Sequence, residues 1–381
     1  MNIAMLSEWR YPLLGGGQLY TKDLCEYLVK KHSCKVDVFT RAFVFDDNKI
    51  YKKNDHLEWW KLNIFRIWPV TTFFNIFWRL AWLIAVTVFL YKKAKKEKYD
   101  IIHAHSLTPW LPAKIIGLLL KIPVVFSVHG TMHLDTNKRW LLYRGEKFFV
   151  TKIKYDLEMS DSHNILKYKN RNKNIIVMRT CVDHKRFQLN SLPEKYKWNN
   201  FLFIGRLNWQ KWIEYLLEWI GKIDKEFLRE KEFHLNVVGD WELREKIENL
   251  ILKYGIKEFI TMKWSLYGEI IVKEYYSNQV FILPSLAEWQ PLVIFEAFIC
   301  KLPVIATDVG DNKYFIKNWE TGLLLPPWNS DKIKEAIENI LNLGKEKIDS
   351  MWKNWYDLTI NWYTWDIMVD RVYEQYKLLL K

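Results

Sequence analysis

The chain has 381 residues, half of them hydrophobic, which is enough for two domains with full cores. Its net charge of +13 favours anionic partners such as nucleotides or phospholipid head groups. No RNA-binding signature, zinc finger or basic zipper accompanies the charge, so we expect no nucleic-acid partner. The four cysteines lack paired or metal-type spacing, and the first residues, MNIAMLSEW, predict a strand without a signal peptide. We therefore expect a cytoplasmic protein.

A strand, a glycine-rich loop and a helix open the chain. Residues 2–6 predict the strand, Tyr11–Gly17 the loop and Gln18–Lys31 the helix, and a second strand follows at Val36–Thr40. The glycines would let the backbone approach a phosphate at the helix N-terminus. A plain loop explains three consecutive glycines about as well.

The segment Phe73–Tyr91 is strongly apolar and is followed by five lysines between Lys92 and Lys98. It approaches membrane-spanning length, but Asn75 and Arg79 interrupt it and an α/β pattern resumes directly afterwards. We predict a helix packed in its domain with a membrane-facing edge, in preference to a span. Peripheral contact with an anionic membrane follows from the lysines, and a generally basic surface is the competing interpretation.

Histidines mark the ends of two predicted strands. The strand Asp100–His105 ends in HAH, a helix follows at Pro109–Leu120, and the strand Pro123–Val128 leads to His129. A metal site is one interpretation, but no carboxylate cluster or cysteine set accompanies the histidines. We favour His129 as a polar residue facing a cleft. The candidate metal ligands are His103, His105, His129 and His133.

Short apolar strands alternate with helices in both halves of the chain, which predicts two parallel-sheet α/β domains. We expect an N-terminal domain in residues 1–187 and a C-terminal domain in residues 199–360, joined by a polar linker. An amphipathic helix in residues 361–381 is expected to pack back toward the N-terminal domain. The predicted strands of the second half are Phe201–Ile204, Phe233–Val238, Phe259–Lys263, Val280–Leu283 and Val304–Ala306.

Two glutamates, Glu288 and Glu296, lie eight positions apart in the stretch Pro284–Pro303. The first follows a predicted strand, and the second lies in an apolar helix, where an unpaired charge is costly. A strand, a loop with one carboxylate and a helix with another typically form a ligand site at the carboxyl end of a sheet. The simpler interpretation makes Glu288 a helix cap and Glu296 a surface residue.

Two cations, Arg206 and Lys211, follow the first strand of the second half, where a helix begins. Taken alone, the two cations could equally be solvated surface charges or a binding site for a diphosphate. Together with Glu288 and Glu296 they favour a ligand site, because cations bind phosphates and carboxylates bind hydroxyls. A sugar nucleotide offers both groups.

Several motifs resemble those of one enzyme family. In the second half they are FIGRLNWQKWIEYLLEWI, VVGDWEL, EWQPLVIFE, PVIATDVG and NWETGLLLPP, and in the first half GGGQLYTKDLCEYL, DIIHAHS and VFSVHG. In this order they are similar to the retaining glycosyltransferases of family 4. The resemblance implies the GT-B fold, with two facing Rossmann-like domains and an interdomain cleft.

The resemblance also implies roles for residues of the second half. Arg206 and Lys211 would hold the diphosphate of a UDP- or GDP-sugar donor. Glu288 would contact the hydroxyls of the donor sugar at the catalytic centre. Leu292 and Val293 would offer backbone N–H groups to phosphate.

The remaining implied roles concern the ribose and the first domain. Glu296 would bind the nucleotide ribose, and His129 would lie near the anomeric carbon. Gly16 and Gly17 would let the first domain close over the diphosphate. The family needs no metal, and we find no Asp-x-Asp pair that could hold a metal–diphosphate complex, so no cofactor is expected.

The resemblance predicts transfer of a sugar to a glycan or lipid-linked acceptor, in the synthesis of a cell-surface polysaccharide or glycolipid. A non-catalytic nucleotide-sugar-binding protein of the same fold is the main alternative. A phosphorylase or epimerase of that fold is a third possibility.

Tryptophan stands at several positions where the family pattern has glycine, and Lys301 replaces another common glycine. The chain has 21 tryptophans and only 14 glycines, about half the usual ~7% of glycine. Either the protein is a degenerate relative, or its backbone has adapted, or UGA codons that encode glycine were translated as tryptophan. We favour the third hypothesis. The positions are Trp212, Trp241, Trp264, Trp289, Trp319 and Trp328, with Trp352 as a candidate seventh.

Overall fold

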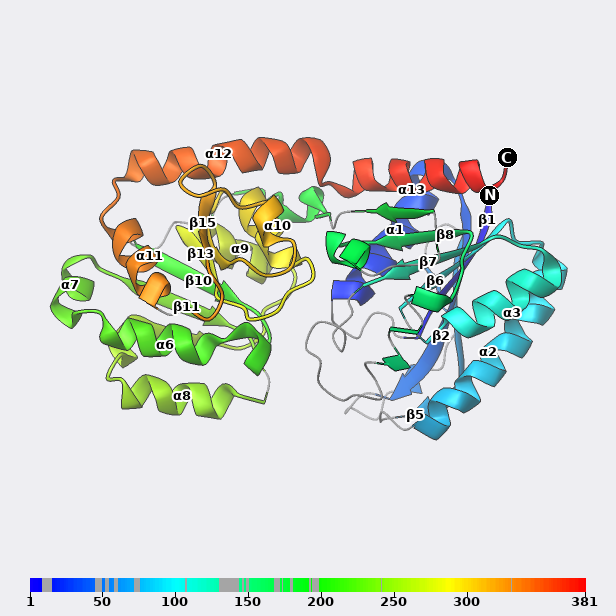
Figure 1. Ribbon diagram of the computed structural model, residues 1–381, viewed down its shortest axis with the longest axis horizontal. Helices are drawn as coiled ribbons and strands as arrows, with labels where there is room; N and C mark the ends of the chain where they lie inside the picture. The colour runs from blue at the N-terminus through cyan, green and yellow to red at the C-terminus, as the bar shows by residue number, and fades with distance from the viewer. Residues whose placement is uncertain are drawn as a thin grey trace. The chain divides into compact units, whose positions relative to one another are not determined.

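The computed structural model divides the chain into two compact units, each described here by itself (Figure 1). The first unit comprises Met1–Thr180 and Trp365–Lys381, and the second comprises Cys181–Thr364. The first boundary therefore falls before residue 187, where the sequence placed the end of the first domain. The structure describes residues 1–8, 16–44, 50–51, 55–57, 61–71, 76–106, 108–129, 144–145, 147–148, 151–167, 172, 174–178, 181–191, 193, 199–240, 242–329 and 331–381.

The first unit is built on a mostly parallel sheet whose strands lie in the order β4-β5-β2-β1-β6-β7-β8-β9, with β3 paired to β2. Only β3 and β4 run antiparallel to their neighbours among the described strands. The strands are β1 (Asn2–Ser7), β2 (Lys35–Val44), β3 (Ile50–Tyr51), β4 (Asp55–Leu57), β5 (Leu62–Thr71), β6 (Ile101–His105), β7 (Val124–Val128), β8 (Leu157–Ser160) and β9 (Ile175–Val177). The helices are α1 (Gly16–His32), α2 (Ile76–Glu97), α3 (Trp110–Leu120), α13 (Trp365–Leu379) and the short 3-10 helix η1 (His163–Lys167).

Helix α13 belongs to the first unit, although it follows the second unit in the sequence. It packs against α1, where the ring of Trp365 lies 5.0 Å from that of Tyr20 and 5.9 Å from that of Tyr27. The Lys31 ammonium lies 2.7 Å from the Asp370 carboxylate at the rim of this contact. Apolar and charged contacts together fix α13 to the unit.

Helix α2 confirms the helix predicted over Phe73–Tyr91, although it continues to Glu97. It buries one stripe, Trp82, Val86, Leu90 and Ala94, spaced four residues apart as one face of a helix requires. Strands β2 and β5 lie against the helix. Across the described parts of the chain, no helix has the length and apolar character needed to cross a bilayer.

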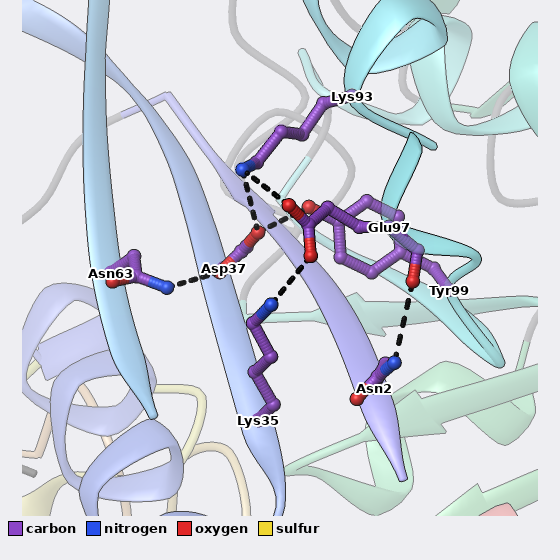
Figure 2. Close-up of polar contacts among 7 residues, drawn as sticks. All are labelled: Asn2, Lys35, Asp37, Asn63, Lys93, Glu97 and Tyr99. Carbon is purple, nitrogen blue, oxygen red and sulfur yellow. Dashed lines mark hydrogen bonds and ion pairs between the residues drawn. The ribbon is translucent and has the colours of Figure 1, made fainter. Parts of the chain in front are cut away.

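A buried carboxylate, Asp37 on β2, organises the polar contacts beside α2 (Figure 2). The Asn63 amide donates a hydrogen bond of 2.7 Å to Asp37, and the Tyr99 hydroxyl donates another. The Lys93 ammonium, from α2, lies 4.0 Å away. Burial and the Asp37 hydrogen bond raise the pKa of Tyr99 above its usual range, so Tyr99 stays a donor.

The end of α2 is held to the sheet by an ion-pair network that continues from Asp37. The Glu97 carboxylate lies 2.5 Å from the Lys35 ammonium and 3.0 Å from that of Lys93 (Figure 2). The Asn2 amide also donates to the Glu97 carbonyl, at 3.4 Å. Hydrogen bonds from Lys35 and Lys93 lower the pKa of Glu97 to about 2. Glu97 therefore stays ionised and directed toward these lysines.

The second unit contains a six-stranded sheet in the order β12-β11-β10-β13-β14-β15 among its described residues, with every pair parallel. Its strands are β10 (Asn200–Ile204), β11 (His234–Val238), β12 (Ile260–Lys263), β13 (Val280–Leu283), β14 (Val304–Thr307) and β15 (Gly322–Leu325). Its helices are α6 (Ile213–Lys222), α7 (Lys225–Glu230), α8 (Arg244–Lys253), α9 (Glu269–Ser277), α10 (Leu292–Ile299), α11 (Asp331–Leu341), α12 (Lys345–Trp362), η2 (His184–Phe187), η3 (Trp209–Lys211), η4 (Lys257–Phe259) and η5 (Asn312–Tyr314).

The central strands of the second unit are short and apolar because helices cover both faces of a parallel sheet. Every residue of β10, β13 and β14 is buried. Polar residues can therefore reach solvent mainly beyond the strand ends. The candidate site residues follow this rule.

Candidate active site

Three predicted site residues of the second unit lie beyond the carboxyl ends of β10 and β13, which are neighbours in the sheet. Arg206 follows β10 and is exposed. Lys211 ends η3 in the same connection, and Glu288 follows β13. In open α/β sheets ligands bind at this edge. The strand order therefore brings together residues that are far apart in the sequence.

The structure joins Lys211 to Glu288 directly. The Lys211 ammonium lies 2.5 Å from Oε1 of Glu288, and the side chains are only 13% and 8% exposed. The Ser285 hydroxyl donates to the same oxygen at 2.6 Å. Glu288 is thus held by a cation and a hydroxyl, and it does not cap α10, whose first turn lacks a side-chain cap.

The loop that carries Glu288 is braced from two sides. The Gln210 side chain donates to the Ala287 carbonyl at 2.7 Å, and the Leu286 amide donates to the Gln210 carbonyl at 2.8 Å. On the other side Gly310 has a φ of 58°, and a Cβ there would lie 2.3 Å from the Glu288 carbonyl oxygen. Only glycine permits this backbone approach.

Helix α10 begins at Leu292 and Val293, directly after this loop. The first amides of a helix have no acceptor within the helix, so they are available to an anion. One turn further, Glu296 accepts a 2.7 Å hydrogen bond from the Tyr275 hydroxyl. Glu296 therefore has a hydrogen-bond partner in Tyr275, which the sequence alone did not identify.

Burial raises the pKa of Glu296, and the hydrogen bond from Tyr275 opposes this shift in part. Burial and the nearby Glu296 charge also raise the pKa values of Tyr275 and Cys300 well above their usual ranges. Both neighbours therefore stay protonated, and Tyr275 acts as a hydrogen-bond donor.

In the first unit, Gly16 and Gly17 begin α1, and His129 follows β7. A Cβ placed on Gly17 would lie 3.6 Å from Cβ of His129, so the two residues are close neighbours. The structure thus brings together two residues that the resemblance assigned to the donor site. Residues 11–15 of the glycine-rich loop and His133 lie outside the described residues.

Both ring nitrogens of His129 have partners inside the first unit. Nδ1 lies 3.3 Å from the Asp161 carboxylate, and Nε2 lies 2.8 Å from Nδ1 of His105. A carboxylate only accepts, so His129 donates from Nδ1. A ring that carries its single proton on Nδ1 accepts at Nε2, and in that tautomer of His129 the donor is Nδ1 of His105.

A third histidine, His103, lies beside this chain and is fully buried. Its Nδ1 is 2.5 Å from the Tyr376 hydroxyl, and its Nε2 is 2.7 Å from the Ser127 hydroxyl. Burial lowers the pKa of His103 to about 3, and burial with the neighbouring histidines lowers that of His105 well below its usual value. Both rings are therefore neutral at physiological pH.

The histidines form hydrogen-bonded chains, and the described residues include no group of three or more His, Cys, Asp or Glu arranged to hold a metal ion. The sequence analysis did not identify Asp161 as a site residue. The signal in the sequence was its place two residues before a histidine in MSDSHN, directly after the short alternating stretch LEMS that forms β8 (Leu157–Ser160). Asp161 lies beside His129 because β8 pairs with β7 in the sheet, and the sequence alone did not predict that pairing.

Two family models match the chain. Residues 14–161 match the model described as Glycosyltransferase Family 4, and residues 184–356 match that of the Glycosyl transferases group 1. Between them they span most of both units.

Individual proteins agree with these matches. An Escherichia coli UDP-Gal:alpha-D-GlcNAc-diphosphoundecaprenol alpha-1,3-galactosyltransferase is 28% identical over 315 residues, which cover 75% of this chain and 77% of that protein. The structure of sucrose-phosphate synthase from Thermosynechococcus elongatus superimposes with a TM-score of 0.81 at 20% identity, covering 99% and 98% of the two chains. Anabaena HepE in complex with UDP-glucose gives a TM-score of 0.74 at 15% identity, covering 98% and 99%.

The fold prediction is confirmed at the level of two parallel-sheet α/β domains of the GT-B type. The family prediction is confirmed by the two models, one on each half of the chain. The protein belongs to the family 4 glycosyltransferases, and it is a nucleotide-sugar-dependent transferase.

Proposed function

We propose that the protein transfers a sugar from a UDP- or GDP-sugar to a glycan or lipid-linked acceptor, with retention of the anomeric configuration and without a metal ion. The observation that carries the proposal is the Lys211–Glu288 pair at the carboxyl edge of the second sheet, with the exposed Arg206 in the same β10 connection. This edge presents cations for a diphosphate and a carboxylate for sugar hydroxyls.

The leaving group explains why cations matter at this edge. When the bond from the anomeric carbon to the diphosphate oxygen breaks, negative charge collects on the diphosphate. Lys211, Arg206 and the amides of Leu292 and Val293 would stabilise that charge from fixed positions. Because these groups belong to the chain itself, the proposal needs no metal ion to neutralise the leaving group.

The other donor contacts are assigned by the same proposal. Glu288 would bind hydroxyls of the donor sugar, and Glu296 the ribose. Gly16 and Gly17 would line the approach of the diphosphate to the first unit, and His129 would lie near the anomeric carbon. The hydrogen bonds from Asp161 and to His105 would hold the His129 ring in place for this role.

The relatives support the substrate classes in the proposal. The Escherichia coli relative is named for a UDP-sugar donor and a diphosphoundecaprenol-linked acceptor, and the HepE structure was solved in complex with UDP-glucose. We therefore propose a role in cell-surface polysaccharide or glycolipid synthesis. A lipid-linked acceptor would favour a cytoplasmic location at the inner face of the cell membrane.

A donor panel tests the proposal. The full chain is incubated with UDP- and GDP-sugars, with and without EDTA, and slow donor hydrolysis is followed by release of the nucleotide. We expect turnover of at least one donor, unaffected by EDTA and abolished in Glu288→Ala. The matched control Glu218→Ala removes a surface glutamate of α6 that pairs with Lys222, and it should keep full turnover.

Tight donor binding without any turnover would instead support a non-catalytic binding protein. Product analysis with an acceptor alcohol gives the stereochemistry. An inverted product contradicts the retaining proposal, and a product formed without an acceptor points to a phosphorylase or epimerase.

A further inference from the structure

Helices α2 and α3 of the first unit carry large apolar side chains on the side away from the sheet. On α2 they are Phe77, Ile84 and Val88, and on α3 they are Ile115, Leu118 and Leu119, with exposures from 37% to 74%. We call these six side chains the apolar face. The α2 residues lie on the opposite side of the helix from its buried stripe, so the packing of α2 on the sheet does not cover them.

The two helices that carry the apolar face are neighbours in the first unit. They contact each other and run side by side in the first unit (Figure 1). Large groups of exposed apolar side chains are rare on soluble monomeric proteins, and where they occur they commonly mark interaction sites. The apolar face is therefore a candidate interaction site.

The charges around the apolar face indicate which occupant. Lys92, Lys95 and Lys96 are exposed at the end of α2, and Lys121 is exposed at the end of α3. The sequence of residues 76–98 and 108–121 contains one carboxylate, Glu97. That carboxylate is directed to Lys35 and Lys93 (Figure 2), so it does not neutralise the exposed lysines.

We propose that the apolar face docks on a bilayer surface that contains anionic phospholipids. Its side chains would enter the boundary between head groups and acyl chains, and the flanking lysines would contact lipid phosphates. A second copy of the chain is a poorer occupant, because a two-fold interface would bring two lysine-rich surfaces together. The proposal does not depend on glycosyl transfer.

Vesicle sedimentation tests the proposal with the full chain. We expect binding to vesicles of phosphatidylcholine with phosphatidylglycerol, weak binding to pure phosphatidylcholine, and release by salt. The triple variant Lys92→Gln, Lys95→Gln, Lys96→Gln should bind about a hundredfold more weakly, from ~1 kcal/mol for each lysine. The double variant Ile84→Ser, Leu118→Ser should weaken binding at least about tenfold.

Matched controls come from the second unit. Leu252→Ser removes an exposed apolar side chain of α8, and Lys332→Gln with Lys334→Gln removes lysines of α11. Both should bind vesicles as the parent does. Equal binding of the parent to charged and uncharged vesicles would overturn the proposal. The proposal would also be overturned if sedimentation velocity showed a dimer of the parent protein that the double variant Ile84→Ser, Leu118→Ser no longer forms. Donor hydrolysis in every variant reports separately on the active site.

A second inference rests on the backbone of three tryptophans. Trp212, Trp319 and Trp328 have φ values of 55°, 64° and 64°, in the left-handed region that bulky side chains avoid. They are three of the ten non-glycine residues with positive φ in the described part of the chain, and none of the ten is Phe or Tyr. The chain contains 41 Phe and Tyr residues, from 21 and 20, so aromatic character alone does not explain the three.

One side-chain feature of Trp212, its indole nitrogen, points the same way, whereas its ring packs on that of Tyr215 at 4.4 Å. Trp212 is almost fully buried, and its indole Nε1 has no hydrogen-bond partner in the described structure. Its ring lies 5.7 Å from that of Trp328, so two of the three tryptophans pack on each other. Trp264 and Trp289 are not in the left-handed region, and Trp241 lies outside the described residues, so the backbone does not decide these three.

Trp365 shows what a tryptophan suited to its position looks like. It lies in the first turn of α13, has no positive φ, and packs between Tyr20 and Tyr27. Glycine there would leave a large cavity and weaken the helix. The two kinds of tryptophan should therefore respond to glycine in opposite directions.

We infer that Trp212, Trp319 and Trp328 are glycines in the protein that the gene's own cells make, specified by UGA codons. Glycine adopts the left-handed region without steric cost. The change also shifts the low glycine count and the high tryptophan count of the chain, 14 and 21, toward ordinary values. Trp212 stands directly after Lys211, so the inference also changes the residue beside the diphosphate site.

Peptide mass spectrometry of the protein purified from its own cells tests this inference. We expect glycine at positions 212, 319 and 328, and tryptophan at position 365 as the internal control. Tryptophan at the three positions, or UGG codons there, would overturn it. In a host that reads these codons as tryptophan, Trp319→Gly and Trp328→Gly should each raise the melting temperature by about 2–4 °C. Trp365→Gly should lower it.

Discussion

The two units hold their candidate site residues in different electrostatic states. In the second unit a charged pair, Lys211 and Glu288, lies with Arg206 beyond the ends of two neighbouring strands. In the first unit a hydrogen-bonded chain of rings runs from His129 to His105, with His103 beside it, and of these His103 and His105 are buried and neutral. Charged groups can bind a diphosphate and stabilise its departure, whereas neutral hydrogen-bonded rings can fix a position without disturbing that charge. In the proposed function, the second unit would bind the donor and the first unit would fix the position of the His129 ring.

The largest effect is expected from the charged pair. Lys211→Ala should lower kcat/KM for donor turnover by about 10²–10³, because it removes a cation that stabilises the negative charge on the leaving diphosphate. It also leaves Glu288 buried without its cation. Lys222→Ala is the matched control, since Lys222 pairs with Glu218 on the surface of the same unit. A change of less than threefold in Lys211→Ala would show that the pair is structural.

A smaller effect on turnover is expected from the neutral chain. Asp161→Asn should lower kcat by about 10- to 100-fold, because the amide no longer fixes the proton on Nδ1 of His129. Nitrogen chemical shifts of the His129 ring should report the altered tautomer. Asp23→Asn, at a half-buried carboxylate of α1 that pairs with Lys22, should change neither quantity. Normal turnover with an altered tautomer would mean that the His129 ring plays no part in the reaction.

The neutral chain should also make the first unit sensitive to acid. The pKa of His103 is lowered from 6.5 to about 3, so the unfolded chain binds a proton that the folded unit excludes. Stability should therefore fall as pH drops from 6.5 toward 3, by about 1.4 kcal/mol per pH unit for this group. Hydrogen exchange of β1 and β6 amides measures it. His103→Asn should flatten the dependence, and an unchanged slope would exclude His103 as its source.

The smallest effect is expected at Glu296 in the second unit, with the opposite sign. Its pKa is raised above 4.5, so the folded unit retains a proton that the unfolded chain releases. Stability should fall as pH rises from 4.5 through the folded pKa, and Glu296→Gln should remove that fall. Urea unfolding of both proteins across this range measures the difference. A larger fall in the variant than in the parent would contradict the assigned direction.

Much of the fold could be predicted because buried parallel strands are short apolar runs with few competing interpretations. The strands Phe201–Ile204 and Val280–Leu283 were predicted within one residue of β10 and β13. Helix α13 was predicted within residues 361–381, because its apolar residues repeat at helical spacing, and it spans Trp365–Leu379. Strand β5 was not predicted, since its ten residues include Arg66 and Pro69. Helix α12 was missed as well, because polar residues interrupt its apolar pattern.

The site could be predicted as a set of residues but not as a set of contacts. The ion pair between Lys211 and Glu288 depends on β10 and β13 being neighbours, although two other strands separate them in the sequence. Similarly, Tyr275 reaches Glu296 from α9, a helix that the sequence analysis did not assign. Sequence spacing identifies which side chains can bind a ligand, whereas strand order and helix packing decide which of them meet.

The membership of α13 in the first unit has a consequence for biosynthesis. The ribosome completes all of the second unit, Cys181–Thr364, before it makes the helix that packs on α1. The ends of the second unit already meet, through the hydrogen bond of 2.9 Å from the Val182 amide to the Tyr363 carbonyl. The second unit can therefore close without α13. The first unit, although translated first, has the side of α1 that receives Trp365 uncovered until α13 has been made.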